Sequence, residues 1–239
     1  MAGLLGSKRA RSLAREKTAK YLLYAAGEVI LIVLGILLAL QMDSWRQDRE
    51  IAAREDDILA QVRADLEKDL AEFDRFVDSR INVTVPYLTA VYEKRWESIP
   101  LDSLQLIGTT YFSFLPFNSA YEGLKSSGEL STIRSEVLRD AIISYYEREH
   151  LHLTDWSTWH KNFVINTLEP YMFNELVMNP EELVADLDHL RSRLEERRLN
   201  SLIATQIGSL NRLNVEIRAA KERAADIIAG IDTELAASS

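Results

Sequence analysis

An uninterrupted apolar run near the N-terminus is the strongest feature of the hydrophobic pattern. Residues 21–40 read YLLYAAGEVILIVLGILLAL, and nineteen of these twenty residues are uncharged. A helix rises about 1.5 Å per residue, so the run spans roughly 30 Å, the thickness of the hydrocarbon core of a bilayer. It is longer than the apolar core of a secretory signal peptide and ends without a small-x-small cleavage site. The pattern predicts an uncleaved transmembrane helix over residues 21–42, embedded in the lipid bilayer, in preference to a signal peptide or a buried helix of a soluble core.

The charges on the two sides of this run predict its orientation. Residues 1–20 carry six bases and one acid, a net charge of +5, whereas residues 43–50 carry both signs. Because positive charge is retained on the cytoplasmic side of a membrane, we expect a basic cytoplasmic tail over residues 1–20. Everything after Met42 then lies on the far side of the membrane, with Trp45 at the outer interface.

One face of the predicted span carries both its only charged residue and two of its small residues. At heptad spacing Glu28, Ile32, Gly35 and Ala39 fall on the same side of the helix. Small residues allow close approach of two helix backbones in lipid, and an acid within a span usually faces protein. We therefore expect this face to pack against a second copy of the chain or another membrane helix. The alternative is a lone anchor in which Glu28 is protonated.

Helical spacing of apolar residues continues beyond the span. No glycine or proline occurs between Gly35 and Pro86, so the helix can run on without a break signal. It passes through a polar neck over residues 43–50 and into an apolar stripe that begins at Ile51. Pro86 is expected to kink or end this helix.

Capping signals divide the middle of the chain. Asn118 or Ser119 can cap a short helix that ends at Gly128, a residue type common just past helix ends. Ser135 can cap a long helix, and Pro170 marks the latest possible end of that helix.

The C-terminal part is predicted to be helical from Asn179, a cap residue followed by a proline at the first helical position. Apolar or small residues there follow spacings of three and four over about four heptads. This seam consists of Ile203, Gln206, Leu210, Leu213, Ile217, Ala220, Ala224, Ile227 and Ile231. We prefer a contact with the helix of residues 51–85 inside one bundle to a purely intermolecular coil, because small Ala220 and Ala224 suit tight packing. The fold class is thus predicted as all-α: one transmembrane helix that continues into an extracytoplasmic antiparallel helical bundle over residues 51–239, with long coiled-coil-like helices.

Charge and composition exclude several classes of function. Residues 41–239 carry 22 bases and 35 acids, a net charge of −13, which disfavours binding to nucleic acid. The chain has no cysteine, so thiol catalysis and cysteine-based metal sites are excluded. It also contains neither a glycine-rich phosphate loop nor an HExxH motif. We therefore expect no catalytic activity, no cofactor and no metal.

One polar and aromatic cluster remains as a candidate site. It comprises His152, Asp155, Trp156, Trp159 and His160, with the two histidines and Trp156 at helical spacing. A ligand pocket or a weak metal site is one interpretation. We prefer a half-buried helix face with amphipathic aromatic residues.

Two segments resemble a known family. The first runs from Tyr24 through Gly27-Glu28 to Gln41 and Trp45, and the second is YEGLKSSG at residues 121–128. Both are similar to a bacterial family of single-span membrane proteins that contain a domain of unknown function. The resemblance covers about fifty residues well. It implies a bacterial single-span protein with an extracytoplasmic helical domain, and it provides no functional residues to transfer.

These observations leave two functional hypotheses. The first is a membrane-anchored, homo-oligomeric helical scaffold or sensor that acts through interaction. The second is an ion-conducting or proton-coupled subunit that uses Glu28, because the layout of a basic tail, an acid-bearing span and an exported domain also occurs in the stator subunits of bacterial motors.

Overall fold

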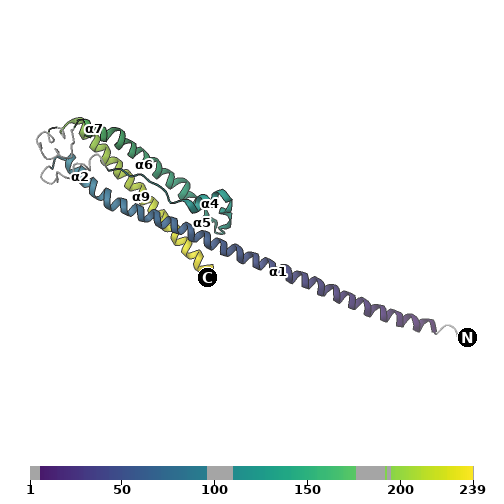
Figure 1. Ribbon diagram of the computed structural model, residues 1–239. Helices are drawn as coiled ribbons and strands as arrows, with labels where there is room; N and C mark the ends of the chain where they lie inside the picture. The colour runs from purple at the N-terminus through teal and green to yellow at the C-terminus, as the bar shows by residue number, and fades with distance from the viewer. Residues whose placement is uncertain (1–5, 96–109, 176–191, 193–194, 239) are drawn as a thin grey trace. The chain divides into compact units, whose positions relative to one another are not determined.

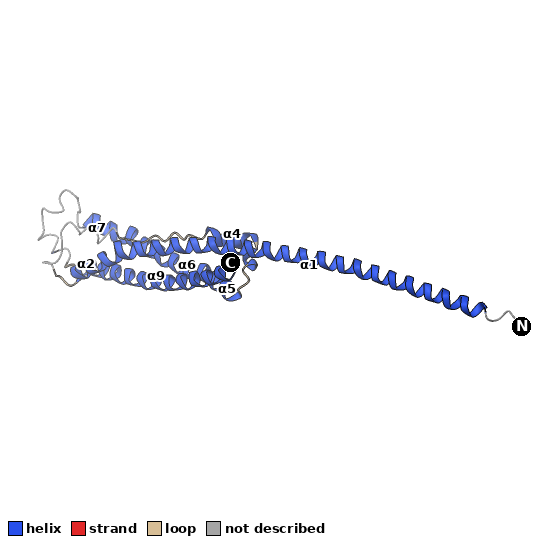
Figure 2. Ribbon diagram, turned by 90° about the horizontal axis from the view of Figure 1, so that it is seen from below, coloured by secondary structure: helices blue, strands red, loops and turns tan. Residues whose placement is uncertain are grey.

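The computed structural model describes residues 6–95, 110–175, 192 and 195–238, with side chains described from Gly27 onward. The helix start predicted at Asn179 lies outside these ranges. Contacts divide the chain into two units, Met1–Arg54 and Glu55–Ser239. Every regular element within the described ranges is a helix and none is a strand, which confirms the predicted all-α class (Figure 2).

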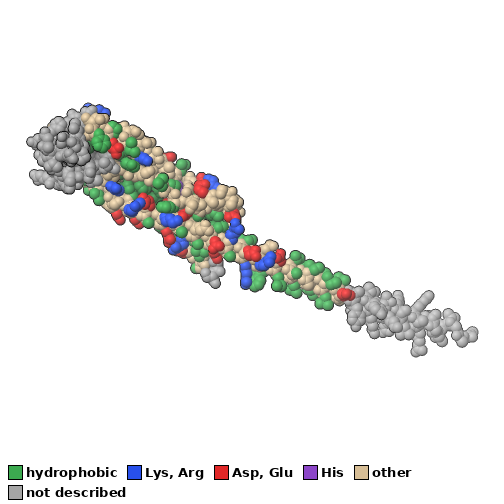
Figure 3. Space-filling model, in the orientation of Figure 1, with side chains coloured by type: hydrophobic (Ala, Val, Ile, Leu, Met, Phe, Trp, Pro, Cys, Tyr) green, Lys and Arg blue, Asp and Glu red, His purple; other side chains and the backbone are tan. Residues whose placement is uncertain are grey.

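The first unit contains the N-terminal part of one long helix, α1 (Gly6–Phe76). Its helix is long and apolar enough to span a membrane. From Val29 to Met42 the large apolar side chains are 47–71% exposed, and Figure 3 shows them as a nearly continuous apolar surface next to the grey N-terminal end. No break occurs after Gly35, as the absence of glycine and proline predicted.

The neck over residues 43–50 is exposed all round and is stabilised along its own length. Arg46 lies 3.4 Å from Asp43 and 3.7 Å from Glu50, and the guanidinium of Arg49 lies 3.7 Å from the centre of the Trp45 ring. Such pairs at spacings of three and four support a solvated helix by a few tenths of a kcal/mol each, about 0.2–0.5. These pairs therefore add to the helical stability of the neck without any contact outside it.

In its described ranges the second unit packs three helical rods side by side (Figure 1). The first rod consists of α1, a π-helical turn η1 (Val77–Ile81) and α2 (Asn82–Tyr92). The second consists of α5 (Glu136–Ser144), η5 (Tyr145–Glu149), α6 (His150–Phe163), η6 (Val164–Leu168) and α7 (Glu169–Glu175). The third is α9 (Arg197–Ser238). A short helix α4 (Ser119–Ser127) and a 3-10 turn η4 (Glu129–Thr132) lie between the first and second rods in the chain.

The directions of the rods follow from their ion pairs and hydrogen bonds. Arg63 lies 2.8 Å from Asp232, and farther along α1 Asp74 pairs with Lys221, so α1 and α9 are antiparallel. The α6 rod is also antiparallel to α9, which packs against α2, α5 and α6. The predicted antiparallel contact with residues 51–85 is present, and α9 also packs on a rod that the prediction did not name.

The predicted seam of α9 forms the centre of this bundle. All nine of its positions are at most 2% exposed. Burial of a large apolar side chain contributes about 1.5–3 kcal/mol. The seam is thus used within the chain, as preferred, and any contact between copies must use another surface.

Both prolines lie inside helices, so the helix end expected at Pro170 is wrong, and of the kink or end expected at Pro86 the end is absent. Pro86 does not end its helix, which continues to Tyr92, and Pro170 lies inside α7 rather than beyond the last helical residue. Pro170 directly follows η6, in which the N–H of Glu169 bonds to the carbonyl of Val164, five residues earlier. The α-helical hydrogen-bonding pattern therefore starts again at α7, and Pro170 lies in the first turn of that helix, where a proline is tolerated. Beyond Pro86 the buried Tyr87, Leu88, Ala90 and Val91 hold the helix in the core. Packing therefore outweighs the lost hydrogen bond at Pro86, whereas the change of register accommodates Pro170.

Candidate functional site

The four residues predicted as a packing face lie on one side of α1 and are not covered by the described part of their own chain. Glu28, Ile32, Gly35 and Ala39 are all exposed, and at about 100° per residue they fall within an arc of roughly 60°. A side chain added at Gly35 would meet no atom within 4 Å. The small residues therefore leave room for the backbone of a neighbouring helix to approach this face closely.

In the second unit an extended segment, residues 110–118, returns along the bundle. Its side chains alternate: Thr110, Phe112 and Phe114 are buried, whereas Tyr111 and Leu115 are exposed. This period of two is typical of an extended chain, although the segment forms no strand. We call residues 110–118 the strap.

The strap is anchored by aromatic stacking on α1. Phe112 stacks on Phe76 with ring centres 4.2 Å apart, and Phe114 stacks on Phe73 at 5.5 Å. Increasing numbers in the strap meet decreasing numbers in α1, so the two run antiparallel. The aromatic contacts thus fix the position of the strap along α1.

Side chains from all three rods satisfy the main chain of the strap. The N–H of Phe114 donates to Ser157 Oγ of α6 at 3.3 Å, and the N–H of Phe117 donates to Asp69 Oδ1 of α1 at 3.1 Å. Gln206 Nε2 of α9 donates to the carbonyl of Thr110 at 2.7 Å. A buried main chain without a sheet partner needs such donors and acceptors, and here the helices provide them.

Asp65 of α1 caps the short helix α4 from outside. Its carboxylate accepts hydrogen bonds from the N–H of Ala120 at 3.0 Å and from Ser119 Oγ at 3.1 Å, and Lys68 lies 3.0 Å away. Burial raises the pKa of Asp65, but these hydrogen bonds outweigh it and hold that pKa below the ordinary value. Asn118 occupies the predicted cap position without a capping side-chain bond.

A second carboxylate of α1, Asp69, lies in the core. Oδ2 accepts hydrogen bonds from Tyr145 Oη at 2.9 Å and His150 Nε2 at 2.8 Å, in addition to the strap N–H on Oδ1. Tyr145 and His150 are five residues apart, and the π-helical turn η5 between them presents both to the same carboxylate. Burial, followed by the Asp69 charge, raises the pKa of Tyr145, so its hydroxyl remains a donor. The cluster is satisfied internally and ties the strap to two rods.

The segment YEGLKSSG builds the outer edge of this region. The Tyr121 ring stacks on Tyr146 with centres 4.6 Å apart, and its hydroxyl donates to Glu147 at 2.7 Å. Lys125 also binds Glu147 and, with Tyr121, lowers its pKa. Gly128 ends α4 with φ of 76°, a left-handed conformation that costs a non-glycine residue about 1 kcal/mol or more.

The predicted histidine and tryptophan cluster is divided between the surface and the core. His152, Asp155 and Trp159 are exposed, Trp156 is half-buried and His160 is fully buried. The two histidines that the spacing assigned to one face therefore differ completely in exposure. Within the described ranges no group of three or more acidic or histidine side chains is placed to hold a metal ion.

His160 belongs to a polar chain inside the bundle. Its Nε2 lies 2.9 Å from Gln206 Oε1, and Gln206 in turn bonds the strap. Because Gln206 Oε1 can only accept, Nε2 carries the proton. Burial lowers the pKa of His160, which favours the neutral ring. This residue thus supports the strap through Gln206.

The aromatic members of the cluster continue along α6 as a surface ladder. Trp156 and Trp159 meet edge to face at 5.9 Å, and Trp159 stacks on Phe163 at 5.8 Å. Arg212 of α9 lies 5.4 Å from the Trp156 ring, within the range of a cation–π contact. Whether this surface binds a ligand stays a prediction.

The residues that sequence reasoning missed are the acids of α1. Glu55, Asp65 and Asp69 are buried, and Glu55 accepts a hydrogen bond from the N–H of Arg134 at 2.7 Å. On a helical wheel all three lie in phase with the apolar stripe that includes Val62 and Phe73. Acidic residues on a face that the spacing predicts to be buried were the signal that could have identified these residues, because a buried carboxylate needs hydrogen-bond donors from the protein.

Comparison with known proteins agrees with the resemblance seen in the sequence. A family model described as a family of unknown function, DUF6090, matches residues 28–190, from the acid of the span to beyond α7. Searches of the curated proteins and of the solved structures found no match. The match covers more than half of the 239 residues and includes the strap, the YEGLKSSG segment and the three buried acids of α1. This chain therefore belongs to DUF6090, a family of unknown function.

Proposed function

We propose that this protein is a membrane-anchored, homo-oligomeric helical interaction module, a scaffold or sensor, of a bacterial inner membrane. Its N-terminus is cytoplasmic, its helical bundle is extracytoplasmic, and it has no catalytic activity. The observation that carries this proposal is the apolar stretch of α1 from Val29 to Met42, whose large side chains are 47–71% exposed. Apolar surface of this extent in water is strongly unfavourable, and lipid together with a partner helix would cover it.

The buried polar side chains of the second unit support a structural role for that unit. Asp65, Asp69 and Gln206 direct their hydrogen bonds to the main chain of the strap and of α4. Each is thereby used in holding the fold, which suits a rigid domain that presents surfaces to a partner.

Fractionation of the full-length chain tests the anchor and its orientation. The chain with a C-terminal tag should stay with membranes after carbonate washing, and protease should remove the tag in spheroplasts. A matched variant with Leu34→Arg and Leu37→Arg should leave the membrane, because each arginine at a span centre costs about 2.5–3.5 kcal/mol. A washed-off parent chain would contradict the anchor, and a tag that is cleaved only after permeabilisation would contradict the orientation.

The second candidate is an ion pathway through Glu28, favoured by the exposed acid within the apolar stretch. Ile32, Gly35 and Ala39 offer no polar group that continues such a path, so we expect Glu28 to bond a neighbouring helix rather than to pass ions. Liposomes with the parent chain should then leak protons or cations no faster than liposomes with Glu28→Gln. A reproducible current that depends on Glu28 would contradict the interaction module and support the ion pathway.

A further inference from the structure

The two ends of the strap are held by groups that differ in charge. At the C-terminal end the N–H of Phe117 bonds to the carboxylate of Asp69. At the N-terminal end the carbonyl of Thr110 accepts from Gln206 Nε2 at 2.7 Å, and Gln206 Oε1 lies 2.9 Å from His160 Nε2. A hydrogen bond to a charged group is stronger than one between neutral groups. The N-terminal end therefore has the weaker attachment, and a histidine stands behind it.

The direction of these hydrogen bonds leaves one nitrogen of the His160 ring without a partner. The Thr110 carbonyl can only accept, so the amide nitrogen of Gln206 faces it and Oε1 faces His160. Oε1 then accepts from Nε2–H, and the lone pair of the neutral ring is on Nδ1. That atom is buried and has no hydrogen-bond partner among the described residues. A second proton would therefore be added at Nδ1, where the structure provides no acceptor for it.

No opposite charge is placed to stabilise a protonated His160. The strap and α2 contain no charged side chain. The charged residues of the surrounding elements that lie nearest along the chain are Asp78 and Arg80 of η1, Asp155 and Lys161 of α6, and Arg212 of α9. Both acids among these are exposed, and Lys161 and Arg212 each lie over an aromatic ring. Burial lowers the pKa of His160, the bond with Gln206 opposes this less strongly, and no described acid contributes.

The strap is the lightest cover over this face of α6. Ser157, three residues before His160, bonds the N–H of Phe114, so both side chains lie on the side of α6 that faces the strap and α9. The strap is a single extended segment, whereas α9 is a rod with a continuous buried seam. Moving the strap exposes less apolar surface than moving a rod, so it is the least costly way to bring water to the ring.

We propose that the N-terminal half of the strap, residues 110–114, is an acid-sensitive latch that opens when His160 takes up a proton. Opening lets water reach Nδ1, while Asp69 keeps the C-terminal end of the strap attached. It also uncovers the rings of Phe76 and Phe112, which stack at 4.2 Å in the closed latch. Acid thus exposes an apolar aromatic surface on the first rod. The latch goes beyond the proposed function and does not depend on the membrane anchor or its orientation.

The sign of the pH dependence follows from proton linkage. Because the pKa of His160 in the closed latch is lower than the ordinary value of 6.5, the closed form binds fewer protons than the open form. The closed latch is therefore most stable above about pH 7 and loses stability as the pH falls below 6.5. One proton raises the opening constant by at most about tenfold per pH unit, so we expect a rise of about three- to tenfold from about pH 7.5 to about pH 5.5.

Hydrogen exchange of the full-length chain in detergent tests the latch. Mass spectrometry gives protection factors for the amides of residues 111–115, corrected for the intrinsic effect of pH. The parent should lose about three- to tenfold of this protection between the two pH values. His160→Gln should remove the loss, because a glutamine amide can still donate to Gln206 but takes up no proton. His152→Gln is the matched control: His152 is exposed on the same helix, so this variant should respond as the parent does.

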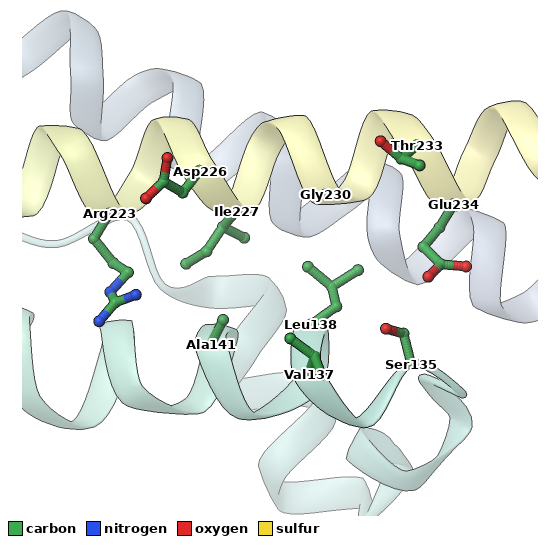
Figure 4. A pocket seen from close by; sticks show the side chains of 10 residues that line it. All are labelled: Ser135, Val137, Leu138, Ala141, Arg223, Asp226, Ile227, Gly230, Thr233 and Glu234. Carbon is green, nitrogen blue, oxygen red and sulfur yellow. The ribbon is translucent and has the colours of Figure 1, made fainter.

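The groove between α5 and the C-terminal part of α9 provides an internal reference (Figure 4). Charged residues line it, among them Arg223 and Glu234, but no histidine does, so the α9 amides beside it should keep their protection between the two pH values. An equal loss of protection there would mean that the whole bundle loosens, and it would overturn the latch. Unchanged protection of the strap, or a His160→Gln variant that still responds to pH, would overturn it too.

A measurement on the parent chain alone makes the test independent of how any variant folds. Histidine-selective NMR gives the pKa of His160 directly. It should lie below the ordinary 6.5, and a value at or above 6.5 would contradict the latch.

Discussion

Two stretches of α1 differ in how their apolar side chains are covered. Around Leu34 the helix is apolar on every side and its side chains are about half exposed, whereas Leu66 and Phe73 are fully buried on one stripe. The second stretch finds its partners within the chain, in the strap and in α9. The first finds none among the described side chains of its own unit, and this exposure is what supports the proposed membrane span. A stripe indicates a bundle, and an all-round apolar surface indicates lipid.

The largest expected difference between the two stretches is in stability. Phe73→Ala should lower the unfolding free energy of the bundle by about 3–5 kcal/mol, because it removes the ring under Phe114 and leaves a cavity. Leu34→Ala should leave that free energy unchanged. Urea unfolding of the full-length chain in detergent, followed by circular dichroism, measures both. Equal effects of the two substitutions would show that the span and the bundle unfold together.

A smaller effect is expected from the acids that distinguish the buried stretch. Asp65→Asn should cost about 1–3 kcal/mol, because a charge-assisted cap of α4 becomes a neutral one. Since the pKa of Asp65 is lowered in the folded protein, its contribution is present above the ordinary value of 3.8 and is lost as the pH falls through the folded value.

The pH dependence provides the check on Asp65. The difference in unfolding free energy between the parent and Asp65→Asn should be constant above about pH 5 and should shrink as the pH falls below the ordinary value of 3.8. Asp57→Asn is the matched control, since Asp57 is exposed on the same helix. A difference between parent and Asp65→Asn that stays constant below pH 3.8 would exclude the titration of Asp65 as its cause.

The smallest expected effect concerns the exposed stretch. Gly35→Leu with Ala39→Leu should weaken association about tenfold, close to 1.4 kcal/mol, because bulky side chains hold two backbones apart. Crosslinking in native membranes measures it, and bundle stability should not change. Val33→Leu with Leu37→Ile alters the opposite side of the helix and should have no effect. An identical crosslinking pattern for the Gly35 and Ala39 variant would show that this face is not a contact.

The outcomes for individual residues show how far local patterns reach. Gly128 ends α4 as predicted, and Ile203 to Ile231 of the seam are buried as predicted, since both follow from spacing and backbone preference over a few residues. The helix ends expected at the two prolines are absent. Pro170 follows a π-helical turn that the local sequence does not predict, and packing holds the helix after Pro86. His160 was placed on a shared face, but a partner 46 residues away, Gln206, draws it into the core.

The sequence by itself determined the helical class, the apolar stretch and the face of α9 that is buried, because each depends on the period of neighbouring residues along one helix. Only the tertiary structure decided that the strap packs against all three rods, that Asp69 holds the strap and that Asp65 caps α4. Those contacts join residues about 48 to 81 positions apart, as in Asp69 with Phe117 and with His150. A period identifies which face is buried, but the partner on that face is set by how the rods pack, and no local spacing encodes it.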